Sequence, residues 1–473
     1  MTPDPHFLGG ADGLRGGLLF SRRTRVHFIG IGGVGMSGIA EVLLNLDYQV
    51  TGSDIRYGTA ARRLAELGAI VYEGHAPGQV GAADVVVISS AIRESNPEIV
   101  AARRRQLPII PRAEMLAELM RMKFAVAVAG SHGKTTTTSM TAVLLHEAGL
   151  DPTTVIGGRV EGIGGSARLG KSDILVAEAD ESDRTFLRLL PVWAVVTGID
   201  REHLDAYEGM EDLKDSFLRF MNMTPFYGGV VLCLDNANLA GLLPRIRRRV
   251  VTYGFAEDAD VTAANVEIDQ GGSRYQLRVR GGIAGTVRLR QPGRTAVQNS
   301  LAAAAVGLEL GIGTRTVREG LEAFSGVDRR FEQRGVVRGV RLVDDYAHHP
   351  SEITATLEGA RAAYGTRTVA IFQPHRFSRV AALDTEFRHA FEQADTVVVT
   401  DIYPAGEEPL PGVTGEALAA GIAATGHPDA RFIGDLEAVA SALAPELRPG
   451  DLVLTLGAGT INRLPDLLRE ALT

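Results

Sequence analysis

The segment at 130–136, Gly-Ser-His-Gly-Lys-Thr-Thr, has the residue types and the order needed to bind a nucleotide phosphate. It lies between an apolar run at 124–128 and a stretch of helical periodicity, so its backbone N–H groups would meet an anion at a helix N-terminus. Lys134 suits the β- and γ-phosphates, and Thr135 suits Mg²⁺. The loop is shorter than the G-x-x-x-x-G-K-S/T pattern, because Val128 stands where the first glycine would fall. We predict phosphate binding here rather than a structural turn alone.

Two acidic segments follow later apolar strands and could hold a metal ion at this loop. Glu178 begins the acidic run 178–183, and His203 lies within Asp-Arg-Glu-His-Leu-Asp at 200–205. Mg²⁺ prefers hard oxygen ligands. A solvated acidic turn and an ordinary surface histidine are the alternatives, and only the position of both residues beside the loop of Lys134 favours metal ligation.

Two further polar clusters, at 344–350 and 373–379, each follow a buried strand. Their arginines can hold a carboxylate or a phosphate through paired hydrogen bonds. Their neutral histidines can accept a proton near pH 7. Because open α/β sheets bind ligands beyond the carboxyl ends of their strands, both clusters are predicted to lie on a working face rather than in chance polar loops.

A glycine-rich loop at 30–35, Gly-Ile-Gly-Gly-Val-Gly, follows the strand at 26–29 and opens a helix. Asp54 lies 19 residues beyond Gly35, where an acid can bond a ribose hydroxyl. The pattern favours a dinucleotide or a sugar nucleotide over a purely structural turn, and it does not identify the ligand.

The elements that position these motifs are apolar strands alternating with helical segments, which is typical of parallel sheets covered by helices. The pattern occurs three times, and strict alternation between Val261 and Leu289 adds an antiparallel hairpin to the second block, followed by an alanine-rich helix at 299–310. We predict an α/β protein with a Rossmann-like N-terminal domain, a central P-loop ATPase domain with a mixed sheet, and a Rossmann-like C-terminal domain. The expected divisions are a flexible tail at 1–23 and domains at 24–122, 123–325 and 326–473.

Length and composition agree with this division and exclude several classes of protein. At roughly 150 residues per domain, 473 residues make about three domains. A net charge of −8 argues against nucleic acid as a partner. There is no apolar run of the ~18 residues that a membrane span requires, so no membrane partner is expected. The single cysteine, Cys233, fits a reducing compartment, and the first twenty residues do not form a secretory signal, so we expect a cytoplasmic protein.

The order of the motifs resembles that of the Mur ligases over roughly residues 24–465. The segments that carry the resemblance are 27–38, 130–136, 178–183, 329–332, 344–350, 373–379 and 401–407. The resemblance implies three domains that bind a UDP-sugar, ATP and an amino acid, in that order. It also implies that the first glycine loop binds a UDP diphosphate rather than a nicotinamide cofactor.

The implied activity is ATP-dependent ligation in the synthesis of a peptidoglycan precursor. In it, the lactyl carboxylate of UDP-N-acetylmuramate attacks the γ-phosphate of ATP, and the amine of L-alanine attacks the resulting acyl phosphate. The last three segments look more like an alanine-adding enzyme than like the ligase that recycles the murein tripeptide, which is the alternative. We expect a monomer or a homodimer.

The resemblance also implies roles for individual residues. The catalytic group is Lys134, Glu178, His203, Arg330, Asp345 and His348. ATP would be bound by Gly130, Ser131, His132, Gly133, Lys134, Thr135, Thr136, Asn299, Arg330 and Asp345. The UDP-sugar would be bound by Gly30, Gly32, Gly33, Val34, Gly35, Asp54 and Ser89. The amino acid would be bound by His348, Arg376 and Arg379, and Mg²⁺ by Thr135, Glu178 and His203.

The sequence departs from the family pattern at a few of these positions. Gly198 replaces a usual Asn, and Glu202 replaces a usual Asp before His203, so a slightly altered metal shell is expected. A usual His-Asn pair appears as Thr-Ala at 295–296. Some relatives carry a carbamylated lysine, and Lys214 is the only lysine near the equivalent position, with no modification predicted.

Two other classes of function compete with the ligase. An oxidoreductase would use the first glycine loop for NAD, but it would have no role for the loop of Lys134. A regulatory nucleotide-binding protein would have no need to retain Lys134, Glu178 and His203 together. Both hypotheses are therefore less favoured than the ligase.

Overall fold

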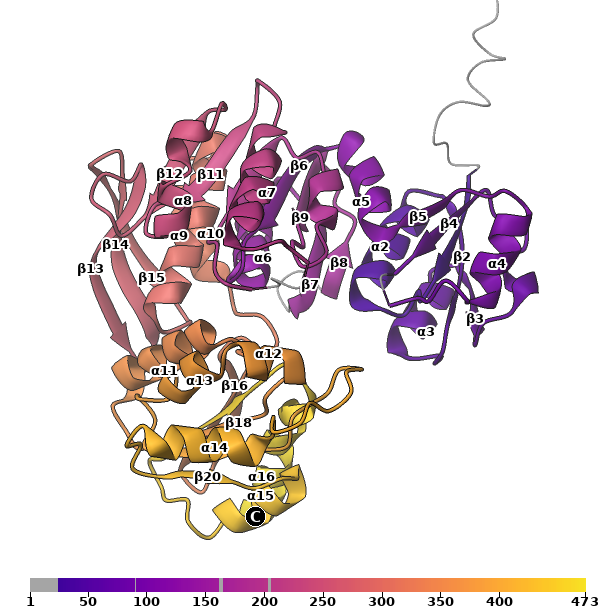
Figure 1. Ribbon diagram of the computed structural model, residues 1–473. Coiled ribbons are helices and arrows are strands. Elements are labelled where there is room, and N and C mark those ends of the chain that lie inside the picture. Colours follow the sequence, from indigo (N-terminus) through magenta and orange to yellow (C-terminus); the bar gives the residue numbers. More distant parts are fainter. Residues whose placement is uncertain (1–23, 90, 161–164, 203–205) are drawn as a thin grey trace, which may run out of the picture.

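The computed structural model describes residues 24–89, 91–160, 165–202 and 206–473, and it confirms three α/β domains (Figure 1). The expected tail at 1–23 lies outside these residues. Each domain is built on one sheet, of five, ten and six strands along the chain. In the described part of the chain, no helix is long and apolar enough to cross a membrane.

The N-terminal sheet is entirely parallel, in the order β3-β2-β1-β4-β5. Its strands are β1 (Arg25–Ile29), β2 (Gln49–Asp54), β3 (Ile70–Glu73), β4 (Val85–Ile88) and β5 (Ile109–Pro111). Its helices are α2 (Val34–Asn45), α3 (Thr59–Glu66), α4 (Pro97–Arg104) and α5 (Arg112–Arg121). The strand order reverses between β1 and β4, which places the glycine-rich loop after β1 at the switch point where such sheets bind ligands.

The central sheet is mixed, as predicted, in the order β15-β14-β13-β12-β11-β10-β6-β9-β7-β8. Its parallel strands are β6 (Phe124–Ala129), β7 (Thr153–Val160), β9 (Ile174–Glu178), β10 (Trp193–Val196), β11 (Gly229–Cys233) and β12 (Val250–Gly254). At the two ends lie β8 (Gly165–Arg168) and the three-stranded extension β13 (Val261–Asp269), β14 (Gly272–Val279) and β15 (Gly282–Leu289). The extension has three strands, one more than the expected hairpin. Its first strand, β13, pairs in parallel with β12 and so connects the extension to the rest of the sheet.

The helices of the central domain are α6 (Lys134–Glu147), α7 (Met210–Asn222), α8 (Ala237–Ala240), α9 (Arg294–Glu309) and α10 (Thr314–Ala323). The alanine-rich helix expected at 299–310 is α9, and it begins earlier, directly after Gly293. Helix α6 packs against α9 and α10 at Gly307 and Gly320, where an added Cβ would lie 2.9 Å from atoms of Leu144. This packing buries most of α6 and fixes the direction of its N-terminus.

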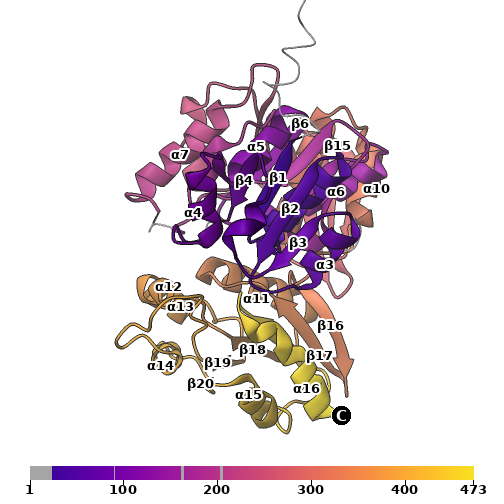
Figure 2. The ribbon, with the colours of Figure 1, turned by 90° about the vertical axis from the view of Figure 1, so that its right-hand side faces the viewer.

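The C-terminal sheet has the order β16-β17-β21-β18-β19-β20, with β16 antiparallel at its edge. Its strands are β16 (Glu332–Val337), β17 (Val340–Asp345), β18 (Thr368–Phe372), β19 (Thr396–Val399), β20 (Ala430–Phe432) and β21 (Leu452–Leu456). Its helices are α11 (Pro350–Tyr364), α12 (Phe377–Ala382), α13 (Asp384–His389), α14 (Gly415–Ala424), α15 (Leu436–Leu443) and α16 (Leu464–Leu472). Figure 2 shows α11 on the side of this domain that faces the other two domains.

Gly52 in β2 provides a test of the N-terminal packing. A Cβ there would lie 2.6 Å from Ile31 Cδ1 and 2.7 Å from Phe28 O, which are atoms of the strand and loop that precede α2. We expect Gly52→Ala to lower the free energy of unfolding by about 1–3 kcal/mol through overpacking, measured by urea denaturation. Gly78→Ala, where a Cβ meets nothing within 4 Å, is the control, and equal effects of the two substitutions would contradict this account.

Candidate active site

The loop predicted to bind phosphate, at 130–133, connects β6, buried from Ala125 onward, with the N-terminus of α6. Two of its glycines are required by their surroundings. Gly130 has φ +135°, and a Cβ there would lie 2.1 Å from Thr197 Oγ1. Gly133 has φ +77°, and a Cβ there would lie 2.5 Å from Asn299 Oδ1. Such backbone conformations suit glycine, and Thr197, just after β10, and Asn299 of α9 leave no room for a side chain at either position.

Lys134 is held inside this loop by a buried carboxylate. Its ammonium donates to Gly130 O at 2.6 Å and to Glu181 Oε1 at 2.8 Å. Burial disfavours the ammonium ion, but the Glu181 carboxylate outweighs burial and raises the pKa of Lys134. The lysine is therefore a fixed cation. Glu181 was not predicted as a site residue, and its only signal in the sequence is its place in the acidic run that Glu178 begins.

The oxygen donors predicted for a metal ion line one cavity with the lysine. Thr135, Glu178, Lys134 and Glu202 border a cavity of about 430 Å³. A hydroxyl and a carboxylate beside a phosphate loop are the hard donors that Mg²⁺ prefers, so Thr135 and Glu178 fit this ion. His203 lies outside the described residues, and its role stays a prediction.

The same cavity reaches both other domains. From the N-terminal domain, Gly35 and Arg112 line it, and from the C-terminal domain Arg330, Tyr346 and His348 do. The glycine-rich loop, the phosphate loop and the end of β17 therefore open into one space. Arg112 was not predicted, because its place beside Gly35 depends on how α5 packs against α2.

Asp54 closes the glycine-rich loop in this structure. Its Oδ2 accepts a hydrogen bond from Gly32 N at 2.8 Å, while Gly30 adopts φ +83°. The expected bond from Asp54 to a ribose hydroxyl stays a prediction. Ser89 lies just beyond the end of β4 and accepts a hydrogen bond from Ala91 N at 3.3 Å.

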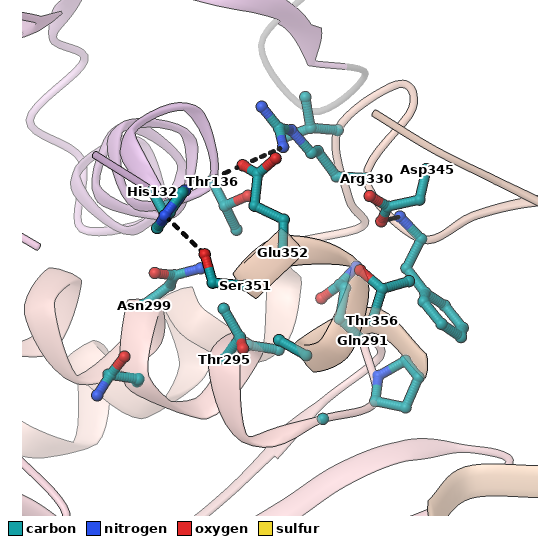
Figure 3. A pocket seen from close by; sticks show the side chains of 18 of the residues that line it. His132, Thr136, Gln291, Thr295, Asn299, Arg330, Asp345, Ser351, Glu352 and Thr356 are labelled. Carbon is teal, nitrogen blue, oxygen red and sulfur yellow. Dashed lines mark hydrogen bonds and ion pairs between the residues drawn. The ribbon is translucent and has the colours of Figure 1, made fainter. Parts of the chain in front are cut away.

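A second cavity, of about 260 Å³, lies between α9 and α11 (Figure 3). Apolar side chains and polar groups share its lining, which comprises His132, Gly133, Thr136, Gln291, Pro292, Gly293, Thr295, Ala296, Gln298, Asn299, Phe324, Val327, Arg330, Phe331, Asp345, Ser351, Glu352, Ala355 and Thr356. Because it includes residues of the phosphate loop, a nucleotide whose phosphates lie at the loop would have its base in this cavity. Thr295 and Ala296, where the sequence was expected to depart from the family pattern, lie in the wall of this cavity.

Asp345 at the end of β17 lines this second cavity. Its carboxylate accepts hydrogen bonds from Phe331 N at 2.7 Å and Ala347 N at 2.8 Å. Burial nevertheless raises the pKa of Asp345 to about 6. Near neutral pH the group is an anion held in place, beside Arg330.

Two of the three residues predicted to bind an amino acid, His348 and Arg379, both lie against His375, which was not among the predicted residues. The rings of His348 and His375 are 5.9 Å apart, and Arg379 Nη1 lies 3.1 Å from His375 Nδ1. Burial lowers the pKa of His348 to about 3 and that of His375 to about 4, so both rings are neutral at pH 7. The charge of Arg376 also faces His375, although no contact joins Arg376 directly to His348 in the described residues.

Polar contacts that the sequence did not indicate join the central and C-terminal domains. The Ser351 hydroxyl donates to Asp200 Oδ2 at 3.1 Å and lies 3.0 Å from His132 Nε2 and 2.7 Å from His349 Nδ1. One ring nitrogen from each of His132 and His349 and one carboxylate oxygen of Asp200 lie within 4.8 Å of one another. The serine hydroxyl bonds to all three, so we interpret the group as a hydrogen-bond junction rather than a metal site.

The positive charge of this junction is carried by His132. Burial disfavours its protonation, but hydrogen bonds to Asp200 and Glu352 outweigh burial and raise the pKa of His132 to about 10. Glu352, on α11, lies 3.3 Å from His132 Nδ1 and 3.8 Å from Arg330 Nη1. A cation in the phosphate loop thus attracts an anion of the C-terminal domain.

Burial of His349 leads to a prediction for acid stability. Burial lowers its pKa from an ordinary value near 6.5 to about 4, so its contribution to stability is present above pH 6.5 and is lost as the pH falls toward 4. The free energy of unfolding of the unaltered chain should therefore fall between pH 7 and pH 5. We expect this fall to be about 2 kcal/mol smaller in His349→Gln than in the unaltered chain. Urea denaturation at both pH values measures this difference. His389→Gln, at an exposed histidine, is the control, and an unchanged loss in His349→Gln would contradict the account.

The fold and the site define a three-domain nucleotide-binding enzyme whose phosphate loop opens toward both other domains. The chain belongs to the Mur ligase family. The matching family models are the Mur ligase family catalytic domain at residues 25–124, the Mur ligase middle domain at 128–307 and the Mur ligase glutamate ligase domain at 329–459.

Individual relatives cover nearly the whole chain. A UDP-N-acetylmuramate–L-alanine ligase of Solibacter usitatus is 53% identical over 455 residues, which are 96% of each chain. The crystal structure of the UDP-N-acetylmuramate-alanine ligase from Thermotoga maritima is 28% identical, with a TM-score of 0.79 over 95% of this chain and 99% of that chain. A murein peptide ligase from Psychrobacter arcticus, at 24% identity, shares the fold with a TM-score of 0.69 over 95% of this chain and 98% of that chain.

Proposed function

We propose that this protein joins L-alanine to the lactyl carboxylate of UDP-N-acetylmuramate, with ATP as the energy source, in peptidoglycan precursor synthesis. The observation that carries the proposal is the single cavity that runs from Gly35 past Lys134 to His348. Three substrates, each bound by a different domain, could meet in this cavity. The identity to the alanine ligase of Solibacter usitatus supports the choice of substrates. Because ATP and UDP-sugars are intracellular metabolites, we place the reaction in the cytoplasm.

The UDP-sugar would bind at the glycine-rich loop. The N-terminus of α2 can bind the diphosphate through backbone N–H groups, and Arg112 beside Gly35 can add a guanidinium. Asp54 and Ser89 lie at the ends of β2 and β4, on the same edge of the sheet. With its diphosphate at the N-terminus of α2, the UDP-sugar would direct its lactyl carboxylate toward the central domain.

The first chemical step would be attack of the lactyl carboxylate on the γ-phosphate, which forms an acyl phosphate and releases ADP. Charge on the transferring group must be neutralised. Lys134 and Arg330 line the same cavity and supply two cations. Thr135 and Glu178 would hold Mg²⁺, which supplies further neutralisation of the phosphates when bound.

The second step would be attack of the alanine amine on the acyl carbon, which expels phosphate. Arg376 and Arg379 would bind the alanine carboxylate and so orient its amine. His348 is neutral at pH 7, so it can accept a hydrogen bond from the amine without adding a competing cation.

The reaction is tested by phosphate release from ATP and Mg²⁺ in the presence of UDP-N-acetylmuramate, with and without L-alanine, and by the mass of the product. We expect release to need both substrates and to yield the alanyl adduct. We expect Lys134→Ala to lower the rate by about 10²–10³-fold, because a preorganised charge is removed from the transition state. Release with the murein tripeptide but not with alanine would instead support the recycling ligase.

The amino-acid site is tested at Arg379. Loss of a charge-assisted hydrogen bond costs about 1.5–3 kcal/mol, so we expect Arg379→Ala to raise the KM for L-alanine by at least about tenfold and to leave the KM for ATP unchanged. Arg361→Ala, at an exposed arginine of α11 that pairs with Asp395, is the matched control. A larger effect on the KM for ATP than on that for alanine would contradict this assignment.

A further inference from the structure

Exposed apolar side chains gather at one end of the central sheet. Phe226 and Tyr227, in the turn before β11, are 94% and 65% exposed, and their rings meet edge to face at 5.3 Å. Met122 before β6 is 45% exposed, and Leu190 before β10 is 38% exposed. Because β6, β10 and β11 are neighbouring parallel strands, all four side chains lie at the same end of the sheet.

Arginines lie beside this aromatic turn. The segment 245–249, Arg-Ile-Arg-Arg-Arg, leads into β12, the next strand of the sheet. Arg248 Nε donates to Thr224 O at 2.5 Å, so the segment packs directly against the turn. The guanidinium of Arg249 lies 5.7 Å from the centre of the Trp193 ring at the start of β10. We name Met122, Leu190, Phe226, Tyr227 and the segment 245–249 the arginine–aromatic edge.

Part of the positive charge of this edge is not neutralised. Arg245 pairs with Asp215 at 2.7 Å and Arg249 with Glu309 at 2.6 Å. Arg247 and Arg248 have no carboxylate within 4.0 Å among the residues that the structure describes, and Arg247 is exposed. The edge thus carries excess positive charge in a chain whose net charge is −8.

The arginine–aromatic edge lies away from the catalytic cavities. It is at the strand starts, whereas the phosphate loop follows the last residue of β6 at the opposite end. The C-terminal domain packs at that loop end, through α11 (Figure 1). A partner bound at the edge would therefore leave the substrate cavities open.

We propose that the arginine–aromatic edge docks on the surface of an anionic lipid bilayer. Aromatic side chains enter the headgroup region without a shaped pocket, and Phe226 projects from its turn rather than filling a recess. Arginines near an anionic bilayer gain attraction from its negative surface potential. The sequence led us to expect no membrane partner because no segment can span a bilayer, and surface docking needs no such segment.

The proposal is tested by sedimenting the full chain with two kinds of vesicle. One kind contains phosphatidylcholine alone, and in the other phosphatidylglycerol makes up about a third of the lipid and gives the surface a negative charge. We expect binding only to the anionic vesicles, weakened by high salt because salt screens exposed charge. We expect Arg247→Gln to weaken binding about fivefold, and Phe226→Ser with Tyr227→Ser to weaken it about tenfold or more. Ligase activity without vesicles should be unchanged in these variants, which checks their folding.

Matched controls come from the other domains. Arg62→Gln on α3 and Val336→Ser on β16 change one exposed arginine and one exposed apolar residue away from the edge, and they should bind vesicles as the unaltered chain does. Equal binding to neutral vesicles, or equal losses in the control variants, would overturn the proposal. Absence of vesicle binding at low salt would also overturn it, and would leave the edge to an acidic protein partner.

Discussion

The arrangement of the active site depends on one buried cation. The Lys134 ammonium lies inside the phosphate loop and pairs with Glu181, a carboxylate that is itself almost fully buried. An unpaired charge in such a place is strongly unfavourable, so β9, which carries the acidic segment, must lie next to β6. The parallel pairing of these two strands provides this. The position of the Lys134 cation in the loop therefore rests on the order of strands in the central sheet.

Polar contacts join the C-terminal domain to this centre, beside the packing of α11 against α9 and β13. Ser351 and Glu352, at the first turn of α11, meet His132 of the phosphate loop and Asp200 beyond β10. The same turn of α11 lines the cavity between α9 and α11. The side chains that join the two domains therefore also line this cavity, so a ligand bound there would lie directly against the contacts between the domains.

Local patterns in the sequence predicted much of this architecture and less of the site. The buried strands, the loop at Lys134 and the mixed central sheet follow from apolar runs, glycines and strict alternation, which act over a few residues. Glu181, Arg112 and Ser351 were not predicted as site residues, because their roles depend on pairs 47 to 219 positions apart or on helix packing. The hydrogen bond from Gly32 N to Asp54 was not predicted either, because the sequence analysis assigned the Asp54 carboxylate to a ligand rather than to the loop backbone.

The contact between Gly133 and Asn299 has a consequence for how this enzyme can vary. Because the loop backbone lies against the amide of α9 without room for a methyl group, the two positions are constrained as a pair. A larger residue at 133 would meet the Asn299 amide in a backbone conformation that favours glycine, and a smaller one at 299 would open a void beside the loop and remove the acceptor for the Thr137 hydroxyl. Variation in the cavity between α9 and α11 is therefore restricted where Gly133 meets Asn299, whereas Thr295, an exposed residue of the same lining, has no such steric partner in the described structure.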